Sequence, residues 1–128
     1  MRVLLDTHAF LWWLDDSPRL SDLARNVIAD ERTRPVFSAV VGWEIAIKVG
    51  MGKLEIPDPP EAFLTEQLSQ NDVEVLPIYL RHALRVFGLP DHHRDPFDRL
   101  LIAQALVEDL AIVTADPEIT TYPVETLW

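Results

Sequence analysis

Residues 96–116 read PFDRLLIAQALVEDLAIVTAD, and this stretch decides the class of fold. Its first part, 96–109, is apolar nearly all round, which predicts a buried helix. Residues 111–114 then form a short apolar run that stops before Asp116, and such a run is typical of a buried parallel strand. A helix that leads directly into a parallel strand indicates an α/β fold whose sheet is covered by helices on both faces.

The rest of the chain repeats this alternation. Short apolar runs predict strands at 2–5, 36–38, 73–78 and 111–114, with 123–127 as an additional edge strand. Helical periodicity and turn signals predict helices at 8–14, 21–31, 39–49, 61–69, 80–88 and 96–109. No repeat, linker or low-complexity segment interrupts the pattern. We therefore expect residues 1–128 to form a single α/β domain around a mainly parallel sheet.

The composition limits the class of protein further. The chain has 128 residues, 48% of them hydrophobic, which is enough for one real core. The absence of cysteine excludes disulfides, thiolate metal sites and thiol nucleophiles. The longest apolar runs are far shorter than the roughly 20 residues that span a bilayer, and the N-terminal residues lack a signal-peptide pattern. We therefore expect no membrane association and a cytoplasmic location.

The charge of the chain is strongly negative, −10, with 21 acids against 11 Lys and Arg residues. Taken alone, this charge argues against a nucleic-acid partner, because phosphates favour a basic protein. The alternative is that some acids are clustered to hold cations, which would reverse the local charge. Composition is compatible with both interpretations, so the positions of the acids have to separate them.

Four acids stand where the predicted fold would bring them together. Asp6 and Asp116 follow apolar strands at their carboxyl ends, the edge at which parallel sheets bind ligands. Glu44 lies in the helix after the second strand, and Asp98 lies in the first turn of the buried helix. Carboxylates at one edge repel each other and titrate as a coupled set unless a cation compensates them. Oxygen ligands without Cys favour Mg²⁺ or Mn²⁺, which would activate water beside a phosphate group.

Some of these acids also have an ordinary structural explanation. Asp6 could cap the helix that opens at Thr7. Glu44 could pair with Lys48 four residues later, an interaction worth roughly 0.2–0.5 kcal/mol. Asp116 could be a turn residue. Two aspartates also stand close together at the start of the buried helix, and Asp95, directly before a proline, is the one whose position indicates an N-cap.

Other polar and aromatic residues give weaker signals. Adjacent histidines point in different directions on most backbones and no third soft ligand is near, so we expect His92 and His93 to lie in a solvated loop or to contact RNA rather than bind zinc. His8 is expected to be a partly buried helix residue, Thr114 a strand residue bordering the site, and Arg99 a phosphate or carboxylate partner. The tryptophans expected to form core or dimer contacts are Trp12, Trp13 and Trp43.

Four segments together resemble a PIN domain, and more narrowly a VapC-type toxin of a bacterial toxin–antitoxin pair. They read VLLDTHAFLWWL, SAVVGWEIAIKVGMGKL, HRDPFDRLLIAQA and IVTADPEI. The resemblance implies a three-layer α/β/α sandwich with a central sheet of four to five strands. It assigns the family's acids to Asp6, Glu44, Asp98 and Asp116, with Thr114 as the accompanying hydroxyl. It also implies a ribonuclease that depends on Mg²⁺ or Mn²⁺, a cognate antitoxin and frequently a homodimer.

The expected function is therefore metal-dependent cleavage of RNA, in which a water activated by the cation attacks the phosphodiester in line. Thr7, Thr114, Asp95 and Arg99 are the expected neighbours of the acids. The general base could be a carboxylate or a hydroxide on the metal. The main alternative is a catalytically silent PIN-like domain that only binds a partner. A phospho-receiver domain is disfavoured, because it needs an acid pair at the end of the first strand and a Lys after a later strand, whereas Asp6 is followed by Thr7 and His8 and no Lys follows 112–116. A phosphatase with an Asp-x-Asp nucleophile is disfavoured because position 8 is His.

Overall fold

Five parallel strands form one sheet, in the order β3-β2-β1-β4-β5, in the computed structural model, which describes residues 1–128. The strands are β1 (Arg2–Leu5), β2 (Arg34–Ser38), β3 (Glu74–Leu76), β4 (Ala111–Val113) and β5 (Thr126–Leu127). The helices are α1 (Thr7–Leu14), α2 (Asp22–Ala29), α3 (Ala39–Gly50), α4 (Pro60–Gln70), α5 (Leu80–Arg85) and α6 (Pro96–Glu108), with 3₁₀ turns η1 (Val86–Gly88) and η2 (Ile119–Thr121). The predicted α/β class is confirmed.

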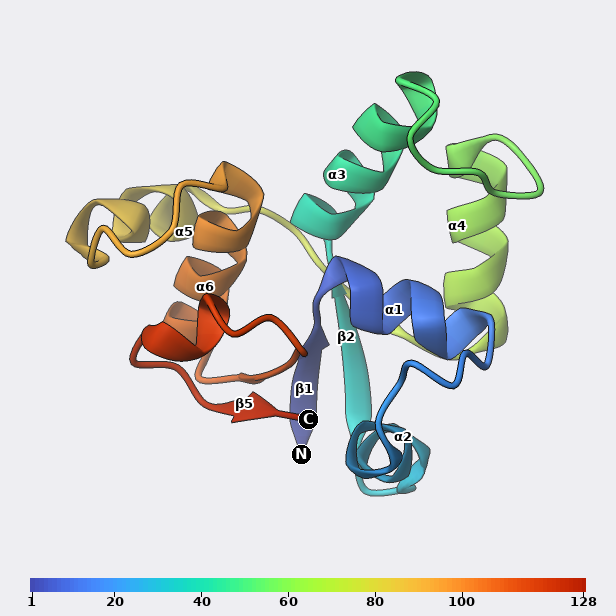
Figure 1. The fold of residues 1–128 in the computed structure, drawn as a ribbon, viewed down its shortest axis with the longest axis horizontal. Helices are drawn as coiled ribbons and strands as arrows, with labels where there is room; N and C mark the ends of the chain where they lie inside the picture. The colour runs from blue at the N-terminus through green and yellow to red at the C-terminus, as the bar shows by residue number, and fades with distance from the viewer.

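The sheet lies between two layers of helices. Helices α5 and α6 lie on one side of strands β1 and β2, and α1 and α4 lie on the other (Figure 1). A single apolar cluster of 23 buried residues fills the space between the layers. β1 and β4 are covered on both faces, which fits the unbroken apolar runs at residues 3–5 and 111–113. None of the helices combines the length and hydropathy needed to cross a bilayer.

Three strand boundaries differ from the predicted ones by two or more residues, and prolines account for two of them. β5 begins at Thr126 rather than at residue 123. β2 begins at Arg34, two residues before the predicted strand, since Pro35 is tolerated near the start of a strand. β3 ends at Leu76 rather than at residue 78, because Pro77 has no N–H to extend the ladder. The expected helix 80–88 forms as a short α-helix followed by the 3₁₀ turn η1.

The register between β1 and β4 sets the position of two polar side chains. Leu5 is paired with Val113, so Asp6 and Thr114, the next residues of each chain segment, lie side by side. The backbone N–H of Asp6 still donates to the carbonyl of Val113, at 3.2 Å. The two central strands therefore present an acid and a hydroxyl at the same point of the sheet's carboxyl edge.

A buried polar connection joins α3 to α6. Ser38 caps α3 by accepting a hydrogen bond from the backbone N–H of Val40 at 2.9 Å, and its hydroxyl donates to the side-chain carbonyl of Gln104 in α6. The amide of Gln104 in turn donates to the carbonyl of Pro77 at 3.1 Å. Because α3 carries Glu44 and α6 carries Asp98, this connection fixes the relative position of two of the four predicted acids.

Candidate active site

Asp6 has a structural partner on each of its two carboxylate oxygens. Oδ1 accepts a hydrogen bond from the backbone N–H of Ala9 at 2.8 Å and caps α1, as the sequence predicts. Oδ2 accepts from the hydroxyl of Thr114. Burial raises the pKa of the Asp6 carboxyl above its ordinary value, although the hydrogen bonds from Thr114 and Ala9 oppose the shift. One carboxylate therefore holds the start of α1 and also faces the pocket described below.

Glu44 is buried and held on both oxygens as well. Oε1 accepts from the hydroxyl of Thr7 at 2.6 Å, and Oε2 lies 2.5 Å from the ammonium of Lys48. The pair with Lys48 is the i,i+4 interaction that the sequence predicts. Here it lies inside the pocket rather than on a solvated helix face, so Lys48 neutralises part of the negative charge at this edge of the sheet.

Asp95 and Asp98 have different surroundings although only one helical turn separates them. Asp95 caps α6, accepting from the backbone N–H groups of Phe97 at 2.9 Å and Asp98 at 3.3 Å, which confirms the predicted N-cap. Burial raises the pKa of the Asp98 carboxyl to about 6, and the charges of Asp95 and Glu44 add to this shift. The hydrogen bond from His93 lowers the pKa without cancelling the shift.

His93 is a site residue to which sequence reasoning gave little weight. Its Nε2 lies 2.8 Å from Asp98 Oδ2, and its Nδ1 forms an ion pair with Glu118. Burial alone would lower the pKa of His93, but Asp98, Glu118 and Asp116 together raise it above its ordinary value. With an acceptor at each ring nitrogen, the imidazolium is the form that this position stabilises.

Polar side chains alone line the open cavity, of about 280 Å³, around these residues. It brings together all four predicted acids, which come from four different elements or their ends. The lining residues are Asp6, Thr7, His8, Glu44, Lys48, His93, Asp95, Asp98, Asp116 and Glu118. The expected neighbours Thr7 and Asp95 are thus in the pocket, and Thr114 lies directly behind Asp6.

The structure corrects two expectations about single residues. Arg99 does not line the pocket and pairs with no carboxylate; its guanidinium donates to the carbonyl of Pro90 at 2.8 Å and to the hydroxyl of Tyr122 at 3.0 Å. His8 is exposed rather than partly buried, and stacks on Trp12 at the edge of the pocket.

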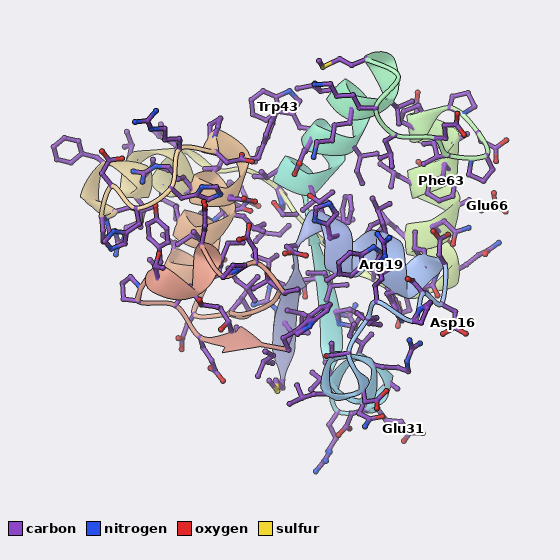
Figure 2. All side chains as sticks on the ribbon, in the orientation of Figure 1. Asp16, Arg19, Glu31, Trp43, Phe63 and Glu66 are labelled. Carbon is purple, nitrogen blue, oxygen red and sulfur yellow. The ribbon has the colours of Figure 1, made fainter.

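For Trp43, expected to form a core or dimer contact, the structure rules out only the core position. Its side chain is 52% exposed, and its ring meets that of Phe97 edge-on at 4.8 Å between centroids. Figure 2 shows Trp43 at the side of α3 that lies toward α5 and α6. Trp12 and Trp13, by contrast, are half-buried and pack against the core as expected.

The donor set of the pocket suits a hard divalent cation. One ligand atom each of His93, Asp98 and Asp116 lies within 4.8 Å of the other two. Asp98 Oδ1 and Asp116 Oδ2 accept no hydrogen bond from the protein, whereas the second oxygen of each is already engaged. Carboxylate oxygens that are available at a cluster of like charges match the preference of Mg²⁺ and Mn²⁺ for oxygen ligands.

Comparison with known proteins identifies the family and the fold. The model of the PIN domain family matches residues 3–124. Ribonuclease VapC22 from Mycobacterium tuberculosis is 30% identical over 122 residues, which cover 94% of this chain and 91% of that protein. VapBC2 from Rickettsia felis, bound to a promoter DNA fragment, aligns with a TM-score of 0.72 at 17% identity over 98% of this chain and 97% of the other. VapBC-1 from nontypeable Haemophilus influenzae aligns with a TM-score of 0.63 at 19% identity, covering 98% and 96%.

The chain is an α/β/α sandwich with an acidic pocket at the carboxyl edge of its parallel sheet, and the family model matches nearly its whole length. The chain therefore belongs to the PIN-domain family. The 30% sequence identity to Ribonuclease VapC22 narrows the family assignment to PIN domains of the VapC type. The predicted resemblance is thereby confirmed.

Proposed function

We propose that this chain is a metal-dependent endoribonuclease that acts as the toxin of a toxin–antitoxin pair. The observation that carries the proposal is the pocket itself, with six carboxylates and no apolar side chain in its lining. Such a cluster costs folding free energy unless a cation neutralises it, so a fold that retains it is expected to bind one. The VapC relative that is named a ribonuclease supports the choice of reaction.

The proposed cofactor is Mg²⁺ or Mn²⁺, held by Asp6, Glu44, Asp98 and Asp116. When bound, such a cation activates water for attack on a phosphodiester and neutralises charge on the phosphate oxygens. Neighbouring side chains orient three of these carboxylates. Thr114 holds Asp6, Thr7 and Lys48 hold Glu44, and His93 holds Asp98.

A cognate antitoxin is the proposed protein partner. Two structurally similar proteins are VapBC assemblies, which supports this assignment. We expect the antitoxin to inhibit by placing an Arg or Lys among the acids, because paired hydrogen bonds to carboxylates are strong. Should inhibition survive the removal of every cationic residue in the partner's toxin-binding segment, this mode of inhibition is wrong.

The oligomer proposed is a homodimer. Leu80, Leu84 and Phe87 recur at helical spacing along α5 and η1, and all three are exposed, with Phe87 at 98%. An exposed apolar stripe of this kind is a common mark of a protein–protein interface. We further propose that residues 1–128 form one PIN domain and that the protein acts in the cytoplasm.

Induced expression followed by sequencing of RNA ends tests the proposed activity. New ends at defined positions are expected for the wild-type chain and for Glu31→Gln, which changes an exposed acid in the turn after α2 (Figure 2). They are expected to be absent for Glu44→Gln and Asp98→Asn. The purified protein should cleave the same RNA with Mn²⁺ and not with EDTA. Cleavage that is equal in both conditions would contradict the metal dependence, and no cleavage by a folded wild-type protein would favour the silent binding domain.

A further inference from the structure

The two lysines of the chain lie at one place. Among 11 Lys and Arg residues only Lys48 and Lys53 are lysines; Lys48 lies in the last turn of α3, and Lys53 lies in the turn that follows the helix. The turn that ends the helix brings them together. The N–H of Lys53 donates to the carbonyl of Lys48 at 2.9 Å, and that of Gly52 donates to the carbonyl of Val49 at 3.1 Å. Gly52 has a φ of 72°, the left-handed conformation that this helix ending requires.

These lysines line a second cavity that adjoins the acidic pocket. This cavity, also about 280 Å³, shares Thr7, His8 and Lys48 with the pocket of acids. Its remaining lining residues are Leu11, Lys53 and Leu54, so it contains no carboxylate. The positive charge of the lysines is therefore next to the acids but is presented to a separate space.

The two lysines differ in how far their charge is already compensated. Lys48 is paired with Glu44, and its side chain is still 38% exposed. Lys53 is exposed and forms no ion pair or side-chain hydrogen bond. No arginine lines this cavity or the acidic pocket, and most arginines are already paired with carboxylates elsewhere, as in Arg25 with Asp16 and Arg81 with Glu108. A purely structural role in the helix would account for Lys48 but not for Lys53.

A strand of RNA needs positive charge at this place. The chain carries a net charge of −10, and the pocket contributes six carboxylates that repel every phosphate of the strand. A bound cation would neutralise the phosphate that is cleaved, but the neighbouring phosphates would still approach an acidic surface. Lys ammonium groups act as point charges for phosphate, and the half-buried Leu11 and Leu54 offer apolar contact to the sugar or base between them.

We propose that Lys48 and Lys53 form a phosphate-binding subsite beside the acidic pocket, which holds the RNA backbone phosphate next to the one that is cleaved. The subsite rests on the proposed ribonuclease function and adds the placement of the substrate strand. Lys53 binds the phosphate directly, and Lys48 joins the subsite to the acids through Glu44. Because phosphate is common to all nucleotides, the subsite contributes affinity without sequence preference.

The test uses an oligoribonucleotide that spans a cleavage position mapped after induced expression. The kcat and KM for cleavage with Mn²⁺ are measured over a series of KCl concentrations for the wild type, Lys53→Gln, Lys53→Arg and Arg19→Gln. Arg19 is the matched control, since it is exposed, forms no ion pair and lines neither cavity. Thermal melts verify that each variant is folded. Lys53→Gln preserves the pair between Lys48 and Glu44, so its effect does not arise from moving an acid.

Lys53→Gln is expected to raise KM several-fold and to leave kcat nearly unchanged. The slope of log(kcat/KM) against log[salt] should become shallower by about 0.7, the value for one phosphate contact on a single strand. Lys53→Arg should restore the slope, and Arg19→Gln should keep it. Cleavage with equal slopes for Lys53→Gln and Arg19→Gln overturns the subsite and leaves the proposed function intact. The subsite is also overturned if Lys53→Gln weakens only inhibition by the antitoxin, which would make the lysines a protein contact. If mapping finds no RNA cleavage at all, the proposed function fails together with the subsite.

Discussion

Asp98→Asn should stabilise the metal-free protein, because the Asp98 carboxylate is more costly to ionise in the folded chain than in the unfolded one. Its pKa is raised from an ordinary value of 3.8 to about 6. The folded state therefore binds the Asp98 proton more tightly than the unfolded state does. The contribution of the Asp98 proton to the free energy of unfolding is fully present below about pH 4, and it is lost as the pH rises to about 6. At neutral pH the wild-type protein carries the whole penalty.

The size of the penalty follows from the shift. One pKa unit corresponds to about 1.4 kcal/mol, so a shift of about two units gives an upper value of about 3 kcal/mol. The Asp98 side chain is 20% exposed, and solvent lowers the penalty, so we expect Asp98→Asn to increase the free energy of unfolding by about 1–3 kcal/mol. For a domain of this length that corresponds to a rise of the melting temperature of about 4 °C per kcal/mol.

Urea and thermal unfolding in EDTA, at several pH values, measure this difference. Asp22→Asn is the matched control, since Asp22 is also an acid in the first turn of a helix but is exposed. That change should lower stability by a few tenths of a kcal/mol, because a favourable interaction with the helix dipole is lost. The reasoning is refuted if Asp98→Asn is no more stable than wild type at neutral pH, or if its advantage persists unchanged below pH 4.

Three further predictions concern the same pocket. Mn²⁺ should raise the melting temperature of the wild type relative to EDTA, because the cation binds only the folded state. It should raise the melting temperature of Asp98→Asn much less. Wild-type melting curves that coincide in Mn²⁺ and in EDTA would mean that no cation site exists. Asp95→Asn should leave stability and cleavage largely intact, since Asn caps a helix as well as Asp, whereas Asp95→Ala should cost about 1 kcal/mol in urea unfolding. Thr114→Val should lower the free energy of unfolding by about 1–3 kcal/mol and reduce cleavage, because it leaves buried Asp6 without its hydroxyl donor. Thr114→Ser should retain the stability and the cleavage of the wild type. Equal behaviour of the two variants would contradict the role of the Thr114 hydroxyl.

The parts of the molecule that could be predicted are those that follow from periodicity and strand ends. Asp6 and Asp116 were predictable because a parallel sheet brings the carboxyl ends of its strands to one edge. Asp95 and Asp98 could be assigned different surroundings because a cap before proline and an acid on an apolar helix are local patterns. All four acids do line one pocket, although their role in catalysis stays a prediction.

The residues that the sequence did not reveal depend on contacts between distant segments. The loop before α6 carries His93, whose backbone N–H donates to the hydroxyl of Tyr122 at 2.8 Å, and Arg99 donates to the same hydroxyl. These bonds turn His93 toward Asp98 and Glu118, and no periodic pattern encodes them. Arg99 was expected near the acids because it follows Asp98 in the sequence, but its position is decided by this loop. The only local signal for His93 was its place five residues before Asp98.

The hydrogen bond between Ser38 and Gln104 also has a consequence for cation affinity. It joins α3 to α6, and so it helps to hold Glu44 and Asp98 in place although their negative charges repel each other. A site that has to be assembled by its ligand loses affinity to the work of rearrangement, whereas a site that is already formed does not. The free energy needed to keep the acids together is supplied during folding, by a hydrogen bond that lies in the core and contacts no ligand. Gln104, which is fully buried and does not line the pocket, is thus the residue through which a change in core packing would reach the affinity of the pocket for its cation.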